Sequence, residues 1–393
     1  MFWDKINGST TLKVWTSKTN VMKKKTIAII GESYIGTGKG LYPVELFKAL
    51  NKISKKHNFK LYLRDSAPFD GPNVIKVKTF DTKIRILSGL GYHIPLFYEL
   101  RKDKSIDLIH AYDVKTNIVS LLLRKPTVVT EYDIYPLDYR FPLDYIFRFL
   151  YGLLGKANSI ISVSDYLETL LVRECPSLSK KISTVHLGVD TERFKPSTKK
   201  RKGETVTIGI LGNLDQDGAL GDVDGKLWNV FEKIVKEYGE NVRIIIGGGG
   251  IPAGFDKLKA YPQVEFKGFI EESDLVKYYQ GIDIFIYKYN RYIYKHKVVE
   301  ATATFELIPL EAMACGCAVL ASKKGALLEV VGEGGVLIEN SEKNFYENIK
   351  ELIENKKLRE NIQRKGRTKA KTLTWDKCAK EHLKIYEKIT NGK

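Results

Sequence analysis

Short apolar runs alternate with amphipathic stretches along most of the chain. Thr26–Ile30 is a continuous apolar run behind a basic flank, which predicts a buried strand, and a glycine-rich turn follows it. Val44, Leu46, Phe47 and Leu50 are then spaced along one face of a helix. Further β-rich runs, most of them followed by a helical pattern, are "IDLIHAYD", "KPTVVTEYD", "NSIISVSD" and "KISTVHLGVD". This order predicts a doubly wound α/β domain with a parallel sheet over residues 22–197.

The same pattern restarts after the lysine-rich segment Lys195–Glu204, which has the composition of a linker. The second series contains "TVTIGILG", "LWNVFEKIVKEYG", "VRIIIGGGG", "VEFKGF", "ESDLVKYYQG", "IDIFIY", a helix beginning at Pro309, "AVLAS" and "GVLIE". We predict a second Rossmann-like domain over residues 198–374, followed by a helix over 375–393. Residues 1–21 fit neither domain and are interpreted either as an extension or as the result of an upstream start. A length of 393 residues suits two domains.

The positive charge is concentrated in the first half of the chain. Residues 1–200 carry 33 Lys and Arg against 19 Asp and Glu, whereas residues 201–393 carry 31 against 28. We expect the first half to meet an anionic partner, which is a phosphorylated small molecule, an acidic membrane surface or nucleic acid. A merely soluble, lysine-rich surface remains the alternative. Nucleic acid is the weakest of the three partners, because no helix-turn-helix spacing, zinc-ligand set or RNP-like strand is present.

The cysteines and the apolar runs give no sign of a metal site, an export signal or a membrane span. Cys175, Cys315, Cys317 and Cys378 form no CxxC pair, so we interpret them as reduced thiols and expect no bound metal. The runs "IDIFIY" and "YIFRFLYGLLG" are far shorter than the ~20 residues that cross a bilayer. The start "MFWDKINGST" lacks the pattern of a signal peptide. The sequence predicts a cytoplasmic protein.

Glycines follow three of the predicted strands, at the sheet edges where α/β proteins bind ligands. Gly36, Gly38 and Lys39 lie between the first strand and the first helix, where backbone N–H groups suit a phosphate. The segment is not a Walker A loop, and a tight turn without a ligand stays open as the alternative. Gly212 and Gly248 would let the backbone approach a ligand closely, or they are simply flexible turns.

The order of these landmarks resembles the retaining glycosyltransferases of family 4. The resemblance covers nearly everything after residue 22 and rests on "GTGKGLYPVELFKAL", "DLIHAYD", "ISVSDYLETLL", "ISTVHLGVDTERFKP", "TIGILGNL", "VRIIIGGGG", "VEFKGFIEESDLVKYYQGIDIFIY", "FELIPLEAMACGCAVLAS", "GALLEVV" and the tail from "LRENIQRKG". It implies the GT-B fold, in which two Rossmann-like domains face each other across a cleft. It also implies that the helix after Trp375 crosses back onto the first domain.

The resemblance assigns roles to the segment around Pro309. It implies that the backbone of Glu306, Leu307 and Ile308 contacts the diphosphate of a nucleotide-sugar, with Glu306 also a catalytic candidate, and that Glu311 accepts hydrogen bonds from the ribose. A surface carboxylate favoured by the helix dipole is the alternative for Glu311. We also assign Phe269, in the matching segment "VEFKGF", to nucleotide binding.

Several positions depart from the family pattern. Ala303 stands where the family has a glutamate that holds the donor sugar, and Asn213 and Lys226 lie where Arg and Lys normally neutralise the diphosphate. Tyr132, followed by Asp133, replaces a histidine near the reacting sugar. We keep Asn213 and Lys226 as donor-site candidates and Tyr132 and Asp133 as catalytic candidates.

The segment Tyr287–Lys297 is an insertion rich in cations and aromatic residues. Arg291 and Lys295 could replace the missing phosphate-binding pair, whereas a lipid-headgroup contact or a solvated loop are the alternatives. The favoured function is retaining transfer from a nucleoside-diphosphate sugar, without metal, cofactor or carboxylate pair. The expected acceptor is a glycan or a polyprenyl-phosphate-linked molecule at the inner membrane face, which residues 138–156 could touch if they are not a core helix. A degenerate member that binds without transfer is the second interpretation, and nucleic-acid binding is the third.

Overall fold

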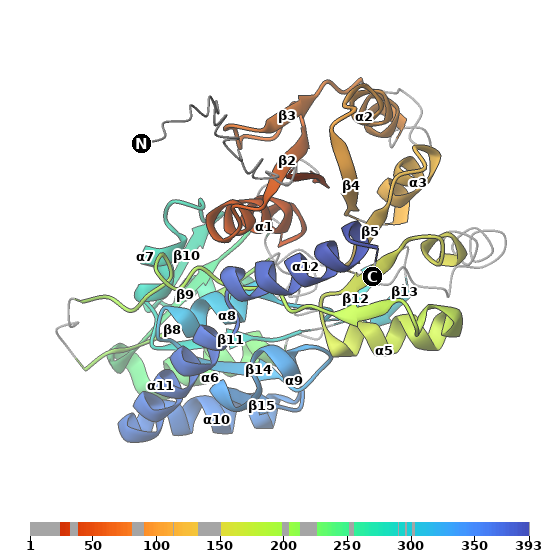
Figure 1. Cartoon of the computed structure of the whole chain (residues 1–393). Coiled ribbons are helices and arrows are strands. Elements are labelled where there is room, and N and C mark those ends of the chain that lie inside the picture. Colours follow the sequence, from red (N-terminus) through yellow and green to blue (C-terminus); the bar gives the residue numbers. More distant parts are fainter. Residues whose placement is uncertain are drawn as a thin grey trace, which may run out of the picture.

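The computed structural model describes residues 24–31, 38–80, 90–112, 114–132, 151–198, 204–212, 226–250, 255–289, 291–294, 297–300 and 303–392 (Figure 1). Its strands form two parallel sheets and one separate hairpin. We call the first sheet and the helices around it the first domain, and the second sheet and its helices the second domain. Two Rossmann-like parallel sheets were predicted, and the structure confirms them.

In the described part of the first domain, the sheet has seven strands in the order β3-β2-β1-β4-β5-β6-β7. The strands are β1 (Lys25–Ile30), β2 (His57–Arg64), β3 (Val74–Val77), β4 (Ile106–Ala111), β5 (Thr127–Glu131), β6 (Ser159–Ser162) and β7 (Ile182–Thr184). Its helices include α1 (Gly38–Ile53), α2 (Leu90–Lys102), α3 (Val114–Leu122) and α5 (Asp165–Glu174), with a 3-10 turn at Pro176–Leu178. The sequence analysis did not predict β2, β3 or α2.

The sheet of the second domain, as far as its residues are described, has six strands in the order β10-β9-β8-β11-β14-β15. The strands are β8 (Val206–Leu211), β9 (Val242–Gly247), β10 (Val264–Gly268), β11 (Ile284–Tyr287), β14 (Ala318–Ser322) and β15 (Val336–Ile338). The helices are α6 (Lys226–Tyr238), α7 (Leu275–Gln280), α8 (Leu307–Ala314), α9 (Leu327–Val330), α10 (Glu342–Glu354) and α11 (Lys356–Thr372), and short 3-10 turns lie at Gly239–Asn241, Phe255–Ala260 and Gly332–Gly334.

The central strands are buried along almost their whole length, which explains their apolar sequences. Every residue of β5, β8 and β14 is buried, as expected for a parallel sheet with helices on both faces.

An aspartate side chain joins two neighbouring strands at the amino-terminal edge of each sheet. Asp107 accepts a 2.8 Å hydrogen bond from the Thr26 amide, and Asp283 accepts a 2.9 Å bond from the Thr207 amide. The aspartate of the repeated "ID", which begins β4 and directly precedes β11, therefore has one structural role in both domains.

Helix α12 (Trp375–Thr390) belongs spatially to the first domain. It packs against α1, and Figure 1 shows it running between the two domains. The His382 Nε2 atom lies 2.7 Å from the hydroxyl of Tyr42, and Tyr386 Oη lies 2.6 Å from His110 Nδ1. Burial lowers the pKa of His382 to about 4 and that of His110 well below its ordinary value, so both rings are neutral at physiological pH. The predicted return of this helix to the first domain is confirmed.

Two local predictions need correction, and the inserted segment contains a strand that the sequence analysis did not predict. Helix α8 begins at Leu307 rather than at Pro309, so Leu307 and Ile308 are in its first turn instead of preceding it. Helix α1 begins at Gly38, which places part of the expected glycine turn in the helix itself. The insertion contains β12 (Arg291–Tyr294), which pairs antiparallel with β13 (Lys297–Glu300), a strand that starts at the last residue of the insertion.

All four cysteines are free thiols, and three of them are buried. Among the described residues, no helix combines the length and the apolar character that crossing a bilayer needs.

Candidate functional site

Glu311 is buried in the second domain, on the helix that follows β11 and the hairpin. Its side chain is on α8, the residue is only 7% exposed, and its Oε2 atom accepts a 2.9 Å hydrogen bond from the hydroxyl of Tyr279. Burial raises the pKa of Glu311 to about 7, although the Tyr279 hydrogen bond and the positive charge of Arg193 act in the opposite direction. The alternative of an exposed surface carboxylate is therefore wrong. A buried carboxylate with one bonded oxygen can accept further hydrogen bonds from a ligand.

Glu306 lies at the start of α8 and faces the end of β11. It is the N-cap residue of α8, but its side chain makes no capping hydrogen bond. Instead, Glu306 Oε2 accepts a 2.6 Å hydrogen bond from the hydroxyl of Tyr287. The amides of Leu307 and Ile308 belong to the first turn, where N–H groups have no acceptor within the helix. The backbone here has the donors that an anion requires.

Glycines at the carboxyl ends of β8, β9 and β10 lie against one another. The Gly248 amide donates to the Gly268 carbonyl at 2.7 Å, and the Gly212 amide donates to the Gly247 carbonyl at 3.3 Å. A Cβ atom on Gly248, whose φ is +131°, would lie 1.8 Å from the Gly212 oxygen. Packing between the strand ends therefore requires glycine at position 248, independently of any ligand. Phe269 follows at the end of β10 and is 65% exposed.

The position of the missing family glutamate is closed. Ala303 is fully buried, and its carbonyl oxygen accepts a 2.8 Å hydrogen bond from the Ala326 amide. Gly325, with a φ of +53°, lies so close that a Cβ atom there would be 2.6 Å from the Ala303 oxygen. Position 303 has no polar side chain to offer a ligand.

Tyr132 lies at the end of β5 in the first domain. Its ring packs edge-on to Tyr42, with 4.9 Å between ring centroids, and at a tilt to Tyr112, with 5.0 Å between centroids. Its hydroxyl is buried and finds no hydrogen-bond partner in the described part of the chain. Burial raises the pKa of Tyr132 well above its ordinary value, so this hydroxyl stays protonated and able to donate.

Several of the predicted site residues cannot be placed in detail. Gly36, Asp133, Asn213 and Lys295 lie outside the described residues. Only backbone is described for Gly38 and Lys39, in the first turn of α1, and for Arg291, the first residue of β12. Lys226 is the half-buried first residue of α6.

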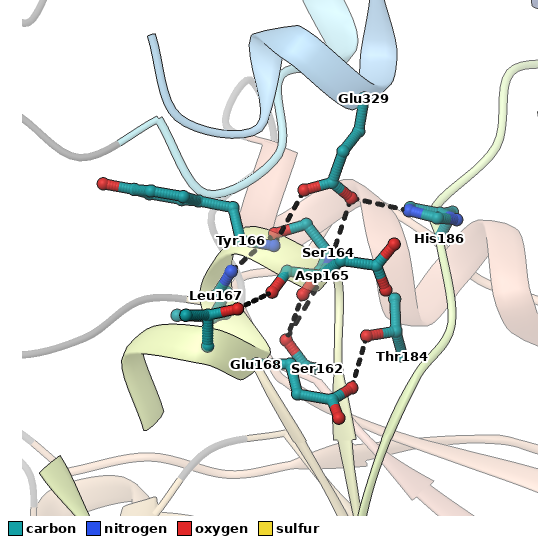
Figure 2. A network of polar contacts seen from close by, with 10 residues as sticks. Ser162, Ser164, Asp165, Tyr166, Leu167, Glu168, Thr184, His186 and Glu329 are labelled. Atoms are coloured by element: carbon teal, nitrogen blue, oxygen red, sulfur yellow. Dashed lines mark hydrogen bonds and ion pairs between the residues drawn. The ribbon is translucent and has the colours of Figure 1, made fainter. Parts of the chain in front are cut away.

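Three residues that the sequence analysis did not single out belong to this region. Tyr279 has the spacing of a core aromatic residue, and only the structure shows that it bonds Glu311. Glu329 and His186 come from different domains and meet at a distance of 2.8 Å between Oε2 and Nε2 (Figure 2). Because the two are distant in the sequence, no local pattern could have paired them.

Two family descriptions match the chain, one in each domain. "Glycosyltransferase Family 4" matches residues 38–193, and "Glycosyl transferases group 1" matches residues 226–369. The chain belongs to glycosyltransferase family 4. This family-4 chain shares 24% identity over 261 residues with spore coat protein SA of Bacillus subtilis, a match that covers 60% of the chain and 66% of that relative. Matches to two further curated relatives cover 26% and 47% of their lengths, so the chain spans less than two thirds of each.

Solved structures show the fold of this family-4 chain. Sucrose-phosphate synthase from Thermosynechococcus elongatus superposes with a TM-score of 0.73 at 18% identity, over 94% of this chain and 100% of that one. HepE from Anabaena, solved in complex with UDP-glucose, gives a TM-score of 0.66 at 17% identity, over 92% and 99%. At these identities the likeness shows a shared GT-B fold and leaves the substrates open.

Proposed function

We propose that the chain transfers a sugar from a nucleoside-diphosphate sugar to an acceptor hydroxyl with retention of the anomeric configuration. In this reaction the bond between the sugar C1 and the diphosphate breaks, and the acceptor oxygen bonds to C1 on the same face. The leaving diphosphate accepts the proton of the acceptor. No metal or further cofactor is part of the proposal.

The observation that carries the proposal is the buried carboxylate of Glu311. A buried carboxylate is costly unless it is hydrogen-bonded, and here Tyr279 supplies one bond while burial still raises the pKa to about 7. Two ribose hydroxyls would supply the missing donors. The first-turn amides of Leu307 and Ile308 lie on the same helix and are suited to the diphosphate. The complex of HepE with UDP-glucose supports a nucleotide-sugar of this kind.

Cations of the inserted hairpin are proposed to stabilise the leaving diphosphate. Arg291 begins β12, and Lys295 is the residue that follows this strand in the sequence, a short distance after β11. Lys288, the residue after β11, is a further basic residue directly before the hairpin in the sequence and is only 2% exposed. Positive charge where negative charge develops is the main catalytic device that such a transfer needs.

The acceptor is proposed to bind the first domain. Tyr132 offers a buried hydroxyl donor at the carboxyl end of β5, together with Asp133 as the next residue. The excess of Lys and Arg in residues 1–200 favours an anionic acceptor, and a glycan on a polyprenyl phosphate combines such a charge with a sugar hydroxyl.

Contact with an anionic membrane is proposed through α2 and α3. Ile94 and Tyr98 are one helical turn apart on α2 and are 42% and 55% exposed, and Leu122 on α3 is 68% exposed. Arg101 and Lys102 lie in the last turn of α2. Binding to anionic vesicles should fall as salt rises, because exposed charges are screened over about 8–10 Å at moderate ionic strength. Equal binding to neutral vesicles would refute this part.

The donor is tested by calorimetry with UDP-, GDP- and ADP-sugars. Glu311→Ala should weaken the binding of the preferred nucleotide by about 1–3 kcal/mol, because it leaves polar partners unpaired. Glu333→Ala removes an exposed carboxylate of the same domain and is the matched control. An unchanged affinity in the Glu311 variant would remove this residue from the ribose role.

Turnover tests the catalytic cations. Arg291→Ala and Lys295→Ala should each slow transfer by roughly 100- to 1,000-fold if the residue neutralises the diphosphate, while Lys357→Ala, an exposed lysine of α11, should change little. Nucleotide binding without transfer from any donor would favour the degenerate, binding-only interpretation. Retention on DNA without nucleotide-sugar binding would favour the third one.

A further inference from the structure

We propose that Glu329 is a positioning residue that holds the first domain against the donor side of the second. The carboxylate is on α9 of the second domain, and it accepts hydrogen bonds from residues of the first domain (Figure 2). The kinetic part of this inference rests on the proposed function, whereas its structural part does not.

The carboxylate binds the exposed amino end of a helix in the other domain. The amides of Asp165 and Tyr166, the first two residues of α5, donate to Glu329 at 2.9 and 2.7 Å. The third amide, that of Leu167, donates to the hydroxyl of Ser164 at 3.0 Å. The helix therefore satisfies one of its first three N–H groups within its own domain and leaves two for Glu329. A negative charge is favoured there by the helix dipole and by charge-assisted hydrogen bonds.

A side chain of the first domain also contacts the Glu329 carboxylate. His186, which follows β7, has its Nε2 atom 2.8 Å from Glu329 Oε2. Partial burial raises the pKa of Glu329, but the hydrogen bonds from His186 and from the two amides outweigh burial and lower it below the ordinary value. The group is thus an ionised carboxylate at neutral pH, with three donors from the opposite domain.

The segment that carries Glu329 also touches residues 303–306, which lead into α8 and which we call the donor loop. The Ala326 amide donates to the Ala303 carbonyl at 2.8 Å, and the ring of Phe305 lies 6.0 Å from that of His186. A Cβ atom on Gly325 would lie 3.2 Å from the Tyr166 ring as well as 2.6 Å from the Ala303 oxygen. Ala303 therefore packs against the residues directly before α9, and Phe305, two residues later, lies beside His186 of the first domain.

The spacing of the domains and the position of the donor loop are consequently set by the same contacts. Glu306 at the end of this loop and the first turn of α8 directly after it are proposed to meet the diphosphate. Removing the carboxylate should let α5 move away from α9 and leave the loop less well positioned. The expected consequence is a loss of transition-state binding rather than of folding.

The test compares Glu329→Gln and Glu329→Ala with the wild type. Glutamine keeps the size but loses the charge and one acceptor atom. We expect kcat/KM to fall about 10- to 100-fold, which is the loss typical of removing a hydrogen bond to a charged group. When the enzyme is saturated with the donor substrate, most of this loss should be seen in kcat. Small-angle X-ray scattering of the donor-free protein should show a larger radius of gyration for both variants, and bound nucleotide should reduce the difference.

Two control variants separate positioning from stability. Ser164→Ala removes a 3.0 Å hydrogen bond from the same helix end, but one that lies within the first domain. Glu333→Gln removes an exposed carboxylate of the second domain. Both should leave the scattering curve unchanged, although Ser164→Ala should lower the unfolding midpoint.

The outcomes decide separately on the two proposals. Scattering curves that match the wild type, together with kcat/KM within twofold, would overturn the role of Glu329. If no donor supports transfer, the scattering comparison still decides whether Glu329 holds the domains together, and only the proposed function fails. Should the alanine variant not fold, the glutamine variant carries the same comparison.

Discussion

The burial of the Glu311 carboxylate predicts how the stability of the folded protein depends on pH. In the ligand-free protein its pKa is raised to about 7, first because of burial, whereas in the unfolded chain it titrates near 4.5. The folded state therefore holds this proton more tightly than the unfolded state. The contribution of Glu311 to stability is fully present below pH 4.5 and is lost as pH rises through 7.

The size of this effect follows from the two pKa values. Between pH 5 and 8 the wild type should lose about 2–3 kcal/mol of unfolding free energy through this one group. Glu311→Gln cannot ionise, and its amide oxygen can still accept the hydrogen bond from Tyr279. As the pH rises from 5 to 8, the unfolding free energy of the variant should therefore increase by about 2–3 kcal/mol relative to that of the wild type.

Urea denaturation of both proteins at pH 5, 6, 7 and 8 measures this difference directly. All other titrating groups are common to both proteins and cancel in the subtraction. A difference that does not change with pH would refute the reasoning, because it would show that Glu311 titrates equally in the folded and unfolded states.

The protonation of Glu311 should also affect how tightly the ribose of the nucleotide binds. Hydroxyl donors favour the ionised carboxylate, so nucleotide affinity of the wild type should fall towards tenfold for each pH unit below 7. The Gln variant should show weaker binding with no such slope. Calorimetry in buffers of different ionisation enthalpy would detect the proton that the wild type releases on binding.

Three further substitutions test particular contacts. Tyr279→Phe should raise the pKa of Glu311 further and weaken nucleotide binding by about 1 kcal/mol, as measured by the stability-pH profile and by calorimetry. Gly248→Ala should destabilise the second domain by roughly 1–3 kcal/mol, since its Cβ would meet a backbone carbonyl at 1.8 Å; a wild-type denaturation midpoint would contradict this clash. Tyr386→Phe should cost about 1–3 kcal/mol of unfolding free energy because His110 loses its partner at 2.6 Å; the matched exposed change Lys384→Ala should stay within about 0.5 kcal/mol.

The apolar patterns predicted the central strands well because a parallel sheet buries both faces of its strands. They failed at β2, where Asn58 and Lys60 interrupt the apolar run. Lys60 is tolerated in this strand because its Nζ atom lies 2.5 Å from Asp103, a residue far along the chain. A local pattern has no access to such a partner.

The candidate site was predictable where a motif fixes the local backbone. The burial of Glu311 follows from its place in the small-residue helix α8, and the glycine at 248 follows from the meeting of strand ends. Tyr279 and Glu329 were not predictable, since their roles come from contacts between separate elements. The start of α8 was misplaced by two residues because proline is tolerated throughout the first helical turn, not only at its first position.

The docking of α12 on α1 affects how the protein is made. The core of the first domain includes Trp375, Cys378, His382 and Tyr386, which are synthesised after the whole second domain. At about 5–20 residues per second, the ribosome makes the first domain many seconds before its closing helix is available. Until then, the surface around Tyr42 and His110 is uncovered, with polar groups that lack their partners and apolar groups open to solvent. We therefore expect nascent chains that end before residue 375 to be bound by chaperones and to be cut readily by proteases in the first domain.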